Sequence, residues 1–185
     1  MGTLVLSGAT SGSTTIAPTD AATVTATFPG ATGTVMVSGN MPAFSAYASG
    51  NQSISASTLT KVQFNTKNFD TATCYDNTTN YRFTPTVAGY YLITANVEYS
   101  TTSGAGVLII NTILYKNGSA YAKGTQSPAG ATNNVGTSVT SVVYLNGSTD
   151  YVEIYSYQNV ANPLATLASD FGNAVRFEGV LVRTA

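Results

Sequence analysis

The sequence predicts an all-β fold, a sandwich or jelly roll of antiparallel strands. Apolar and polar residues alternate with period two along most of the chain, which is typical of strands with one buried face. Gly, Asn and Pro divide the chain into short runs at even spacing, as in sandwiches and jelly rolls. The only stretch with helix-like composition, residues 163–168, is too short to form a helix alone.

Residues 1–40 are rich in Thr, Gly and Ala and form the first predicted unit. Its apolar runs at residues 4–6, 24–28 and 35–37 have the length of brief strands. Strands this short cannot form a core alone, so we expect them to pack on a sister chain or a larger assembly. The predicted boundary lies at residues 40–42, and the second unit covers residues 43–185.

The second unit contains longer predicted strands. One strand places five residues on a single buried face, namely Tyr91, Ile93, Ala95, Val97 and Tyr99. The next strand, residues 107–116, ends at Asn117-Gly118, which favours a tight hairpin turn because both positions tolerate positive φ. Three more strands follow, and the alternation places them over residues 135–145, 151–157 and 175–181.

Charge is scarce in this chain. Charged residues make up 8% of the sequence and the net charge is -1, whereas soluble proteins carry about 25% charged residues. The few cations are scattered, so we expect no binding to nucleic acid, which requires clustered Lys and Arg. Such a surface recognises ligands through hydrogen bonds, aromatic faces and shape, and a monomer with so few charges benefits from burial in an oligomer.

Several site and targeting classes are excluded by residue type. The chain has no histidine, which removes Ser-His-Asp and Cys-His arrangements and the usual zinc ligands. Cys74 is the single cysteine, so no intramolecular disulfide forms, and we expect a small buried residue there. The N-terminus lacks a signal-peptide pattern, and no run approaches the roughly 20 apolar residues of a membrane span.

The spacing of aromatic residues after Ala43 resembles the globular heads of the complement C1q and tumour-necrosis-factor family. The family's spacing of an aromatic, an acid or amide, and a second aromatic is matched by Phe64, Asp70 and Tyr75. Phe83 follows one residue later than in the family pattern, Gly89 and Tyr91 then fall in place, and Ile93 stands where the family prefers Phe. The closing segment Phe177-Glu178-Gly179-Val180-Leu181, the segment from Leu145 to Val152 and the opening strand at Ala43 to Ala46 are also similar.

This resemblance implies a ten-stranded jelly roll that assembles as a homotrimer and is not an enzyme. The positions that it places in the core or the trimer interface are Phe44, Phe64, Tyr75, Phe83, Gly89, Tyr91, Ile93, Phe177, Gly179 and Leu181. We expect a tight backbone turn at Gly89, and close approach of a neighbouring strand or chain at Gly179. Some relatives bind calcium near the three-fold axis, so Asp150 and Asp170 are weak candidates, although no acidic cluster is visible and no other cofactor is expected.

Residues 11–18 and 27–35 resemble a Thr/Gly-rich segment found at the start of phage tail-fibre and other virion proteins. The resemblance implies a protein made in the host cytoplasm and carried on the virion surface, on the tail or the capsid. Residues 1–40 would then trimerise or dock to other virion proteins, and residues 43–185 would face outward.

Two groups of residues are candidates for ligand binding. One strand face carries three tyrosines, Tyr151, Tyr155 and Tyr157, and Tyr144 is expected nearby on the preceding strand. These tyrosines either form a platform that binds sugar rings or pack in the core and the trimer interface. The loop over residues 124–136 offers Gln126, Asn133 and Asn134 for recognition, unless it is an ordinary connection.

Asp70 and Asp76 are the closest pair of acids, and paired carboxylates are the catalytic groups of glycosidases. Capping of turns by Asx hydrogen bonds is the competing interpretation. Three functions therefore stay open. The first is a trimeric tail-fibre or tail-tip protein that binds a host surface glycan or protein. The second is a capsid-decorating or head-fibre protein of the same fold. The third is a glycan depolymerase that recruits Asp70, Asp76 and Asp150 across the trimer interface.

Overall fold

The computed structural model describes residues 4–7, 11–16, 25, 37, 41–100, 108–124, 127–129, 134–159, 164–166 and 173–185. Every regular element in these ranges is a strand, which confirms the predicted all-β class. The chain divides into two compact units, residues 1–34 and residues 35–185. The predicted boundary at residues 40–42 remains a prediction.

In the described part of the first unit, β1 (Leu4–Ser7) and β2 (Ser13–Ile16) form an antiparallel hairpin. Gly12, which precedes β2, has a φ of 83°, a left-handed conformation that glycine adopts without strain. The side chains of Val5, Leu6 and Ile16 are exposed. The predicted runs at residues 24–28 and 35–37 lie outside the described residues, apart from Thr25 and Val37.

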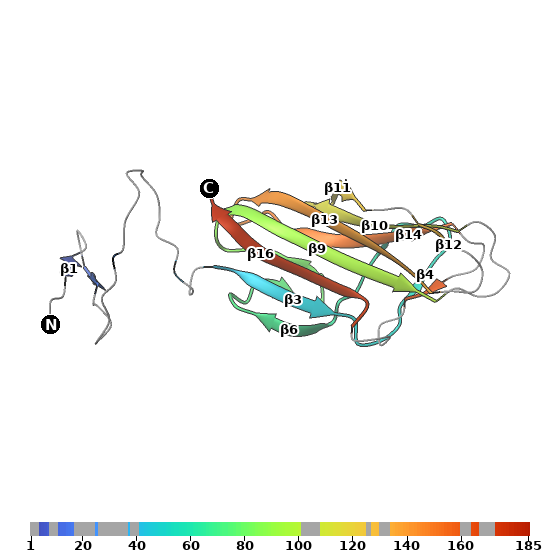
Figure 1. The fold of residues 1–185 in the computed structure, drawn as a ribbon, viewed down its shortest axis with the longest axis horizontal. Helices are drawn as coiled ribbons and strands as arrows, with labels where there is room; N and C mark the ends of the chain where they lie inside the picture. The colour runs from blue at the N-terminus through green and yellow to red at the C-terminus, as the bar shows by residue number, and fades with distance from the viewer. Residues whose placement is uncertain are drawn as a thin grey trace. The chain divides into compact units, whose positions relative to one another are not determined.

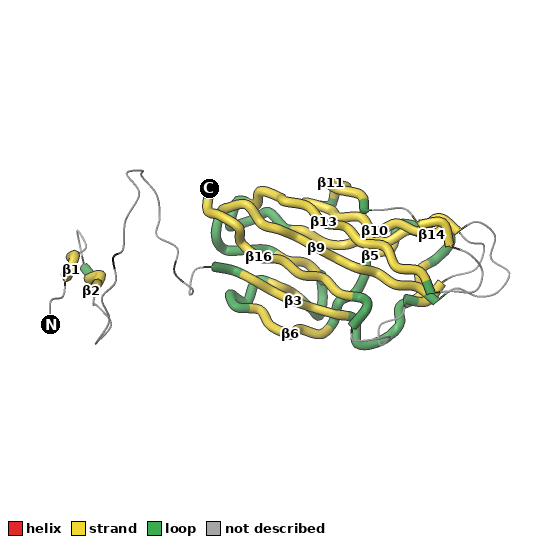
Figure 2. The backbone as a smooth tube through the Cα atoms, viewed as in Figure 1, coloured by secondary structure: helices red, strands yellow, loops and turns green. Residues whose placement is uncertain are grey.

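The second unit is a sandwich of two antiparallel sheets (Figures 1 and 2). The five-stranded sheet has the order β13 (Val135–Leu145), β9 (Gly89–Tyr99), β16 (Arg176–Thr184), β3 (Ala43–Tyr47) and β6 (Thr66–Asp70). The seven-stranded sheet has the order β11 (Ser119–Lys123), β10 (Leu108–Lys116), β14 (Val152–Gln158), β8 (Arg82–Phe83) and β7 (Tyr75–Asp76). In addition, β12 (Ser127–Ala129) pairs with β10 and β5 (Thr60–Lys61) pairs with β14. A small separate sheet joins β4 (Ser53–Ile54) to β15 (Leu164–Ala165).

The chain crosses between the two sheets repeatedly. It runs from β9 in the five-stranded sheet to β10 in the other, returns to β13, crosses again to β14 and ends in β16. Strands that follow one another along the chain therefore often lie in opposite layers, and their pairing partners are distant in sequence. This crossing pattern is that of a jelly roll.

The core lies between the sheets and is centred on an aromatic cluster. The ring of Phe44 stacks on Tyr75 and Phe83 with centroid distances of 4.9 Å and 4.4 Å, and Phe177 meets it edge-on at 4.8 Å. The apolar residues predicted for the core or interface are all buried, namely Phe44, Phe64, Tyr75, Phe83, Tyr91, Ile93, Phe177 and Leu181. The alternation in β9 places Tyr91, Ile93, Ala95, Val97 and Tyr99 inward, as predicted.

Each buried tyrosine hydroxyl in this core has a hydrogen-bond partner. Tyr75 and Tyr91 donate to the backbone oxygens of Phe64 and Val87, at 3.0 Å and 2.7 Å. Tyr99 contacts the hydroxyl of Ser156, which links β9 to β14 across the core, and burial raises the pKa of Tyr99 to about 12. The hydroxyls therefore stay protonated, and the aromatic core contains satisfied polar groups.

The turn chemistry predicted for the long hairpin is confirmed. Asn117 and Gly118 have φ values of 51° and 77°, and they connect β10 to β11. The tight backbone turn predicted at Gly89 is wrong, because Gly89 begins β9 in the sheet and has no positive φ. Its missing side chain instead allows β16 to approach, since a Cβ there would lie 2.5 Å from the backbone oxygen of Arg183.

Cys74 is buried, as predicted, and its Sγ lies 3.3 Å from the backbone oxygen of Ala72. Over the described ranges, the chain contains no helix long and apolar enough to cross a membrane.

Candidate functional site

The three tyrosines singled out by the sequence lie on the outward face of the seven-stranded sheet. In β14, Val152, Ile154 and Ser156 point into the core, so the alternate residues point away from it. Tyr151, Tyr155 and Tyr157 are half-buried there. They do not contribute to the aromatic core. Of the two predicted roles, packing in the core is therefore wrong for these residues, and packing in a trimer interface stays a prediction beside the sugar platform.

A fourth tyrosine joins them from a strand that is distant in sequence. β10 pairs with β14, and Tyr115 lies opposite Glu153. The rings of Tyr115 and Tyr155 are 4.2 Å apart between centroids. We call the set Tyr115, Tyr151, Tyr155 and Tyr157 the tyrosine strip.

Charged side chains border the tyrosine strip. The guanidinium of Arg82 lies over the ring of Tyr151, with 4.3 Å between its Cζ and the ring centroid. Lys61 lies 5.7 Å from the centroid of Tyr155 and forms an ion pair with Glu153, which is 3% exposed. Burial and the nearby Glu153 carboxylate raise the pKa of Tyr155, so its hydroxyl remains a hydrogen-bond donor at neutral pH.

Asn111 lies next to the far end of the strip. It pairs directly with Tyr157 across the β10–β14 ladder, so both side chains leave the same face of the sheet. Asn111 is 4% exposed, and its Oδ1 has no hydrogen-bond partner in the part of the chain that the structure describes.

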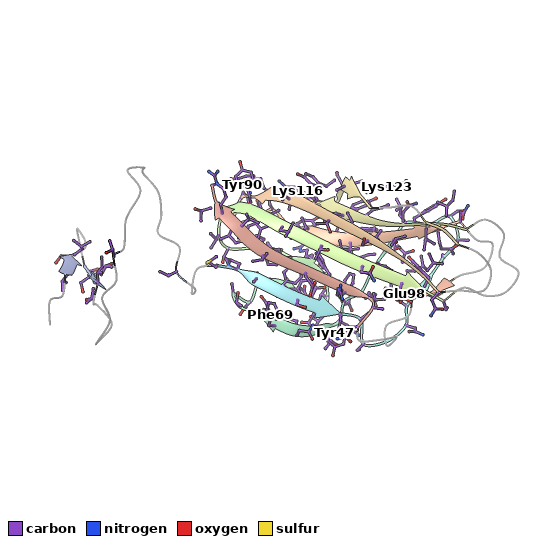
Figure 3. All side chains as sticks on the ribbon, in the orientation of Figure 1. Tyr47, Phe69, Tyr90, Glu98, Lys116 and Lys123 are labelled. Atoms are coloured by element: carbon purple, nitrogen blue, oxygen red, sulfur yellow. The ribbon has the colours of Figure 1, made fainter. Side chains whose placement is uncertain are left out.

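The outward face of the five-stranded sheet is different in character. It exposes seven large apolar side chains, which we call the apolar face: Phe69, Tyr90, Leu92, Val142, Tyr144, Val180 and Val182. The pairing registers place Val142, Leu92, Val180 and Ala43 in one row across four strands. Figure 3 shows Phe69 on β6 and Tyr90 at the start of β9.

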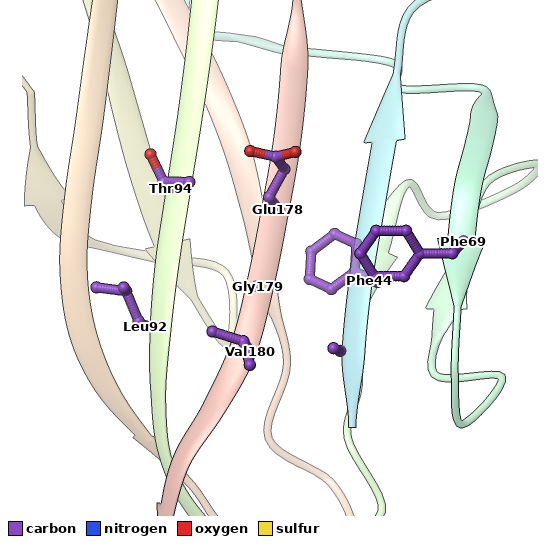
Figure 4. Close-up of a pocket in the computed structure, with 8 residues that line it drawn as sticks. Phe44, Phe69, Leu92, Thr94, Glu178, Gly179 and Val180 are labelled. Carbon is purple, nitrogen blue, oxygen red and sulfur yellow. The ribbon is translucent and has the colours of Figure 1, made fainter. Parts of the chain in front are cut away.

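A groove of about 300 Å³ crosses this face. Phe69 forms one wall and Leu92 and Val180 lie across from it, with Gly179 and the ring of Phe44 at its base (Figure 4). Tyr144 belongs to this face, where its ring lies 5.6 Å from that of Tyr90. The expectation that Tyr144 lies near Tyr151 is therefore wrong, because β13 and β14 are in different sheets.

The carboxylates proposed for glycoside cleavage are engaged as hydrogen-bond acceptors. Asp70 accepts from the backbone N–H groups of Cys74 and Tyr75 at 2.9 Å and 3.0 Å, and pairs with Lys67. Asp76 accepts from the backbone N–H groups of residues 78–80, which holds its pKa well below the usual range. Both residues cap turns. A carboxyl held ionised, as that of Asp76 is, makes a poor general acid.

Asp150 is also fully engaged. Its oxygens accept from the side chain of Asn117 at 2.8 Å, from Lys116 at 3.0 Å and from the backbone of Asn146 at 3.2 Å. These interactions, led by the Asn117 hydrogen bond, lower its pKa. A calcium ion would have to displace Lys116, and no three acidic, His or Cys side chains gather over the described ranges. The other calcium candidate, Asp170, lies outside the described residues.

Of the loop residues expected to contact a ligand, Asn134 is exposed and directly precedes β13. Gln126 and Asn133 lie outside the described residues. Four residues near the strip were not predicted from the sequence, because they reach it through pairing between strands that are far apart along the chain: Arg82, Lys61, Tyr115 and Asn111. No local pattern marks them.

Comparison with known proteins gives a fold. No family model matches the chain, and no curated protein matches it. Among solved structures, it is similar to the globular domain of the zebrafish complement 1qA protein, with a TM-score of 0.51 and 16% identity over 78% of this chain and 99% of that one. It is also similar to Eiger TNF from S. frugiperda, with a TM-score of 0.57 and 12% identity over 78% and 93% of the two chains. Murine APRIL gives a TM-score of 0.54 and 10% identity over 77% and 99%.

The fold is the C1q/TNF jelly roll. At these identities the likeness concerns the fold alone, and it confirms the fold that the aromatic spacing predicted. Within this C1q/TNF jelly roll, the chain has two distinct outward faces, an apolar one on the five-stranded sheet and a tyrosine-rich one on the seven-stranded sheet.

Proposed function

We propose that this chain is a non-enzymatic, homotrimeric binding head on the surface of a phage particle, where it attaches the particle to a host surface glycan. The observation that carries the proposal is the contrast between the two outward faces of one jelly roll. The apolar face is suited to burial against other copies of the chain, and the tyrosine strip is suited to an external ligand.

The apolar face supports self-association. Its exposed side chains are contiguous across β13, β9 and β16, since Val142, Leu92 and Val180 lie in register. Contiguous apolar patches on soluble proteins mark interaction sites. The resemblance to C1q and TNF heads implies a trimer. Burial of the apolar face in that trimer would remove its apolar surface from water, and a chain with so few charged residues gains solubility from such burial.

The tyrosine strip supports binding of a sugar. Tyrosine rings offer flat apolar faces together with hydroxyl groups, and both match the alternating C–H and O–H surface of a saccharide. A trimer would present three strips on one rigid head, which can raise apparent affinity by roughly 10²–10⁴ over a single site. Repeated glycans on a cell surface are suited to such multivalent contact.

The virion assignment depends on residues 1–40 and their resemblance to Thr/Gly-rich segments of phage tail-fibre proteins. In the proposed arrangement this segment docks to other virion proteins. A capsid-decorating or head-fibre protein with the same fold is the alternative. A depolymerase is not proposed, because Asp70, Asp76 and Asp150 serve as acceptors in turns.

The deciding experiment is to label intact particles from the source with gold-conjugated Fab fragments raised against residues 43–185, and to measure adsorption to host cells with and without the Fab. Gold on the tail together with blocked adsorption supports the proposal. Gold spread over the capsid with unchanged adsorption supports the decorating alternative. Particles without label contradict a virion role.

A further inference from the structure

The tyrosine strip has the length and chemistry of a site for a short oligosaccharide. It runs along β14 from Glu153, opposite Arg82, to Tyr157, opposite Asn111. The four residue steps from Glu153 to Tyr157 span about 13 Å in an extended strand. A ligand that lies along this strip meets a cation at one end and tyrosine rings along the rest of its length.

Arg82 is the group that distinguishes among ligands. Its guanidinium lies over the ring of Tyr151, with 4.3 Å between Cζ and the ring centroid, and it has neither a hydrogen bond nor an ion pair with the other described residues. A planar guanidinium with free donors binds a carboxylate through two parallel hydrogen bonds.

The surrounding charges leave Arg82 available to an anion. Glu153, which lies opposite Arg82 in the ladder, is paired with Lys61. Asp76, on the other side of Arg82, accepts hydrogen bonds from its own turn. The positive charge of Arg82 therefore has no dedicated acidic partner among the described residues, and one carboxylate on a ligand would complement it.

The rest of the strip fits the remainder of a sugar chain. The half-buried rings of Tyr155 and Tyr157 offer surfaces for the C–H faces of pyranose rings.

We propose that the tyrosine strip binds an oligosaccharide that carries a carboxylate, with the carboxylate on Arg82 and the sugar rings along Tyr155 and Tyr157. This inference rests on the proposed function and narrows it, since it names the chemical class of the glycan. A uronic acid and a sialic acid both supply the required carboxylate, so both are used as probes.

The test is titration of the purified head with a uronic-acid oligosaccharide and with a sialylated oligosaccharide, each also prepared with its carboxyl groups reduced to alcohols. We expect one of the acidic probes to bind, and its reduced form to bind at least about tenfold more weakly, the size of effect that loss of a charge-assisted hydrogen bond produces. Arg82→Gln should weaken binding of the acidic probe to the same extent and leave the reduced probe unaffected. Tyr155→Ala should weaken both forms.

Two matched variants serve as controls. Arg183→Gln removes an arginine that lies over Tyr90 on the five-stranded sheet, and Tyr121→Ala removes an exposed tyrosine outside the strip. Both should bind the acidic probe as the parent does. All variants are first checked for unchanged mass and melting temperature, so that a lost site is distinguished from a lost fold.

Failure of this inference is separable from failure of the proposed function. Equal binding of acidic and reduced probes, or no effect of Arg82→Gln, overturns the carboxylate assignment. Absence of binding to either acidic probe overturns the inference as a whole. If the Fab still blocks adsorption in those cases, host attachment stands and the ligand is of another class.

Discussion

Gly179 shows how the absence of one side chain shapes the core. It lies in β16 between β9 and β3, opposite Ile93 and Phe44. A Cβ at this position would lie 2.6 Å from Cε1 of Phe44 and 2.7 Å from Cδ1 of Ile93. Phe44 cannot move aside easily, because its ring is stacked against Tyr75 and Phe83. The aromatic core therefore requires glycine here for space.

We accordingly predict that Gly179→Ala lowers the free energy of unfolding by about 1–3 kcal/mol, the usual cost of overpacking a core. Gly50→Ala is the matched control, since Gly50 is exposed and a Cβ there would have no other atom within 4 Å. The measurement is urea unfolding of all three proteins at one chain concentration, because oligomer stability depends on concentration. Equal destabilisation by both substitutions would contradict the packing argument.

Asp150 acts at the level of elements, because it joins the β10–β11 hairpin turn to the turn between β13 and β14. Asn117 belongs to the turn between β10 and β11, and Asn146 begins the turn that follows β13. Asp150 accepts hydrogen bonds from both, and Asn117 in turn accepts from the backbone N–H of Tyr151 at 2.9 Å. The two turns lie at the ends of strands from opposite sheets, so the carboxylate ties the layers together at this end.

The lowered pKa of Asp150 predicts a specific pH dependence of stability. In the unfolded chain an aspartate titrates near about 3.9. A folded pKa below that value adds stability that is fully present above the unfolded pKa and is lost as pH falls through the folded pKa. The difference in unfolding free energy between the parent and Asp150→Asn should therefore be constant above about pH 5 and shrink below about pH 4.

The check is a series of urea unfolding curves for both proteins between about pH 6 and about pH 3, the range over which aspartates titrate. Asp76, whose pKa is also lowered, is present in both proteins, so its contribution cancels in the difference. A difference that stays constant to the lowest pH would show that the Asp150 carboxylate contributes no charge-dependent stability.

For the whole molecule, the apolar face leads to a prediction about mass. If it is the trimer interface, the purified chain should scatter light with three times its mass of 19.1 kDa. Leu92→Asp combined with Val180→Asp should reduce this to the mass of one chain, because each buried unpaired charge costs several kcal/mol. Leu59→Asp is the control, since Leu59 is exposed but lies outside the apolar face. A double variant that keeps the parental mass would place the interface elsewhere.

The same face predicts little effect of salt on assembly. The row formed by Val142, Leu92, Val180 and Ala43 contains no charged residue. The strand that contributes Val180, β16, has its charged residues at other positions, namely Arg176, Glu178 and Arg183. We expect an unchanged mass between about 0.05 M and about 1 M sodium chloride, since screening weakens interactions between charges but not apolar burial. Dissociation at high salt would indicate an interface held by ion pairs.

Local patterns were sufficient for much of the fold. The inward face of β9 follows from alternation, and the turn at Asn117-Gly118 follows from the tolerance of both residues for positive φ. Both features depend on residues close in sequence, so the chain alone specifies them. The burial of Phe44, Tyr75 and Phe177 was implied by the resemblance to the C1q and TNF heads. The number of chains in the assembly and the role of residues 1–40 remain predictions.

The candidate sites, in contrast, were decided by tertiary structure. The pairing of β10 and β8 with β14 brings Tyr115, Asn111 and Arg82 next to the tyrosines of β14 and its N-terminal end. Tyr144 lies on a different face, because β13 belongs to the other sheet. Period-two alternation tells which residues share a face of one strand, but it does not tell which strands are neighbours. That choice depends on how the chain crosses between two sheets to bury their apolar faces together, and it is a property of the whole domain.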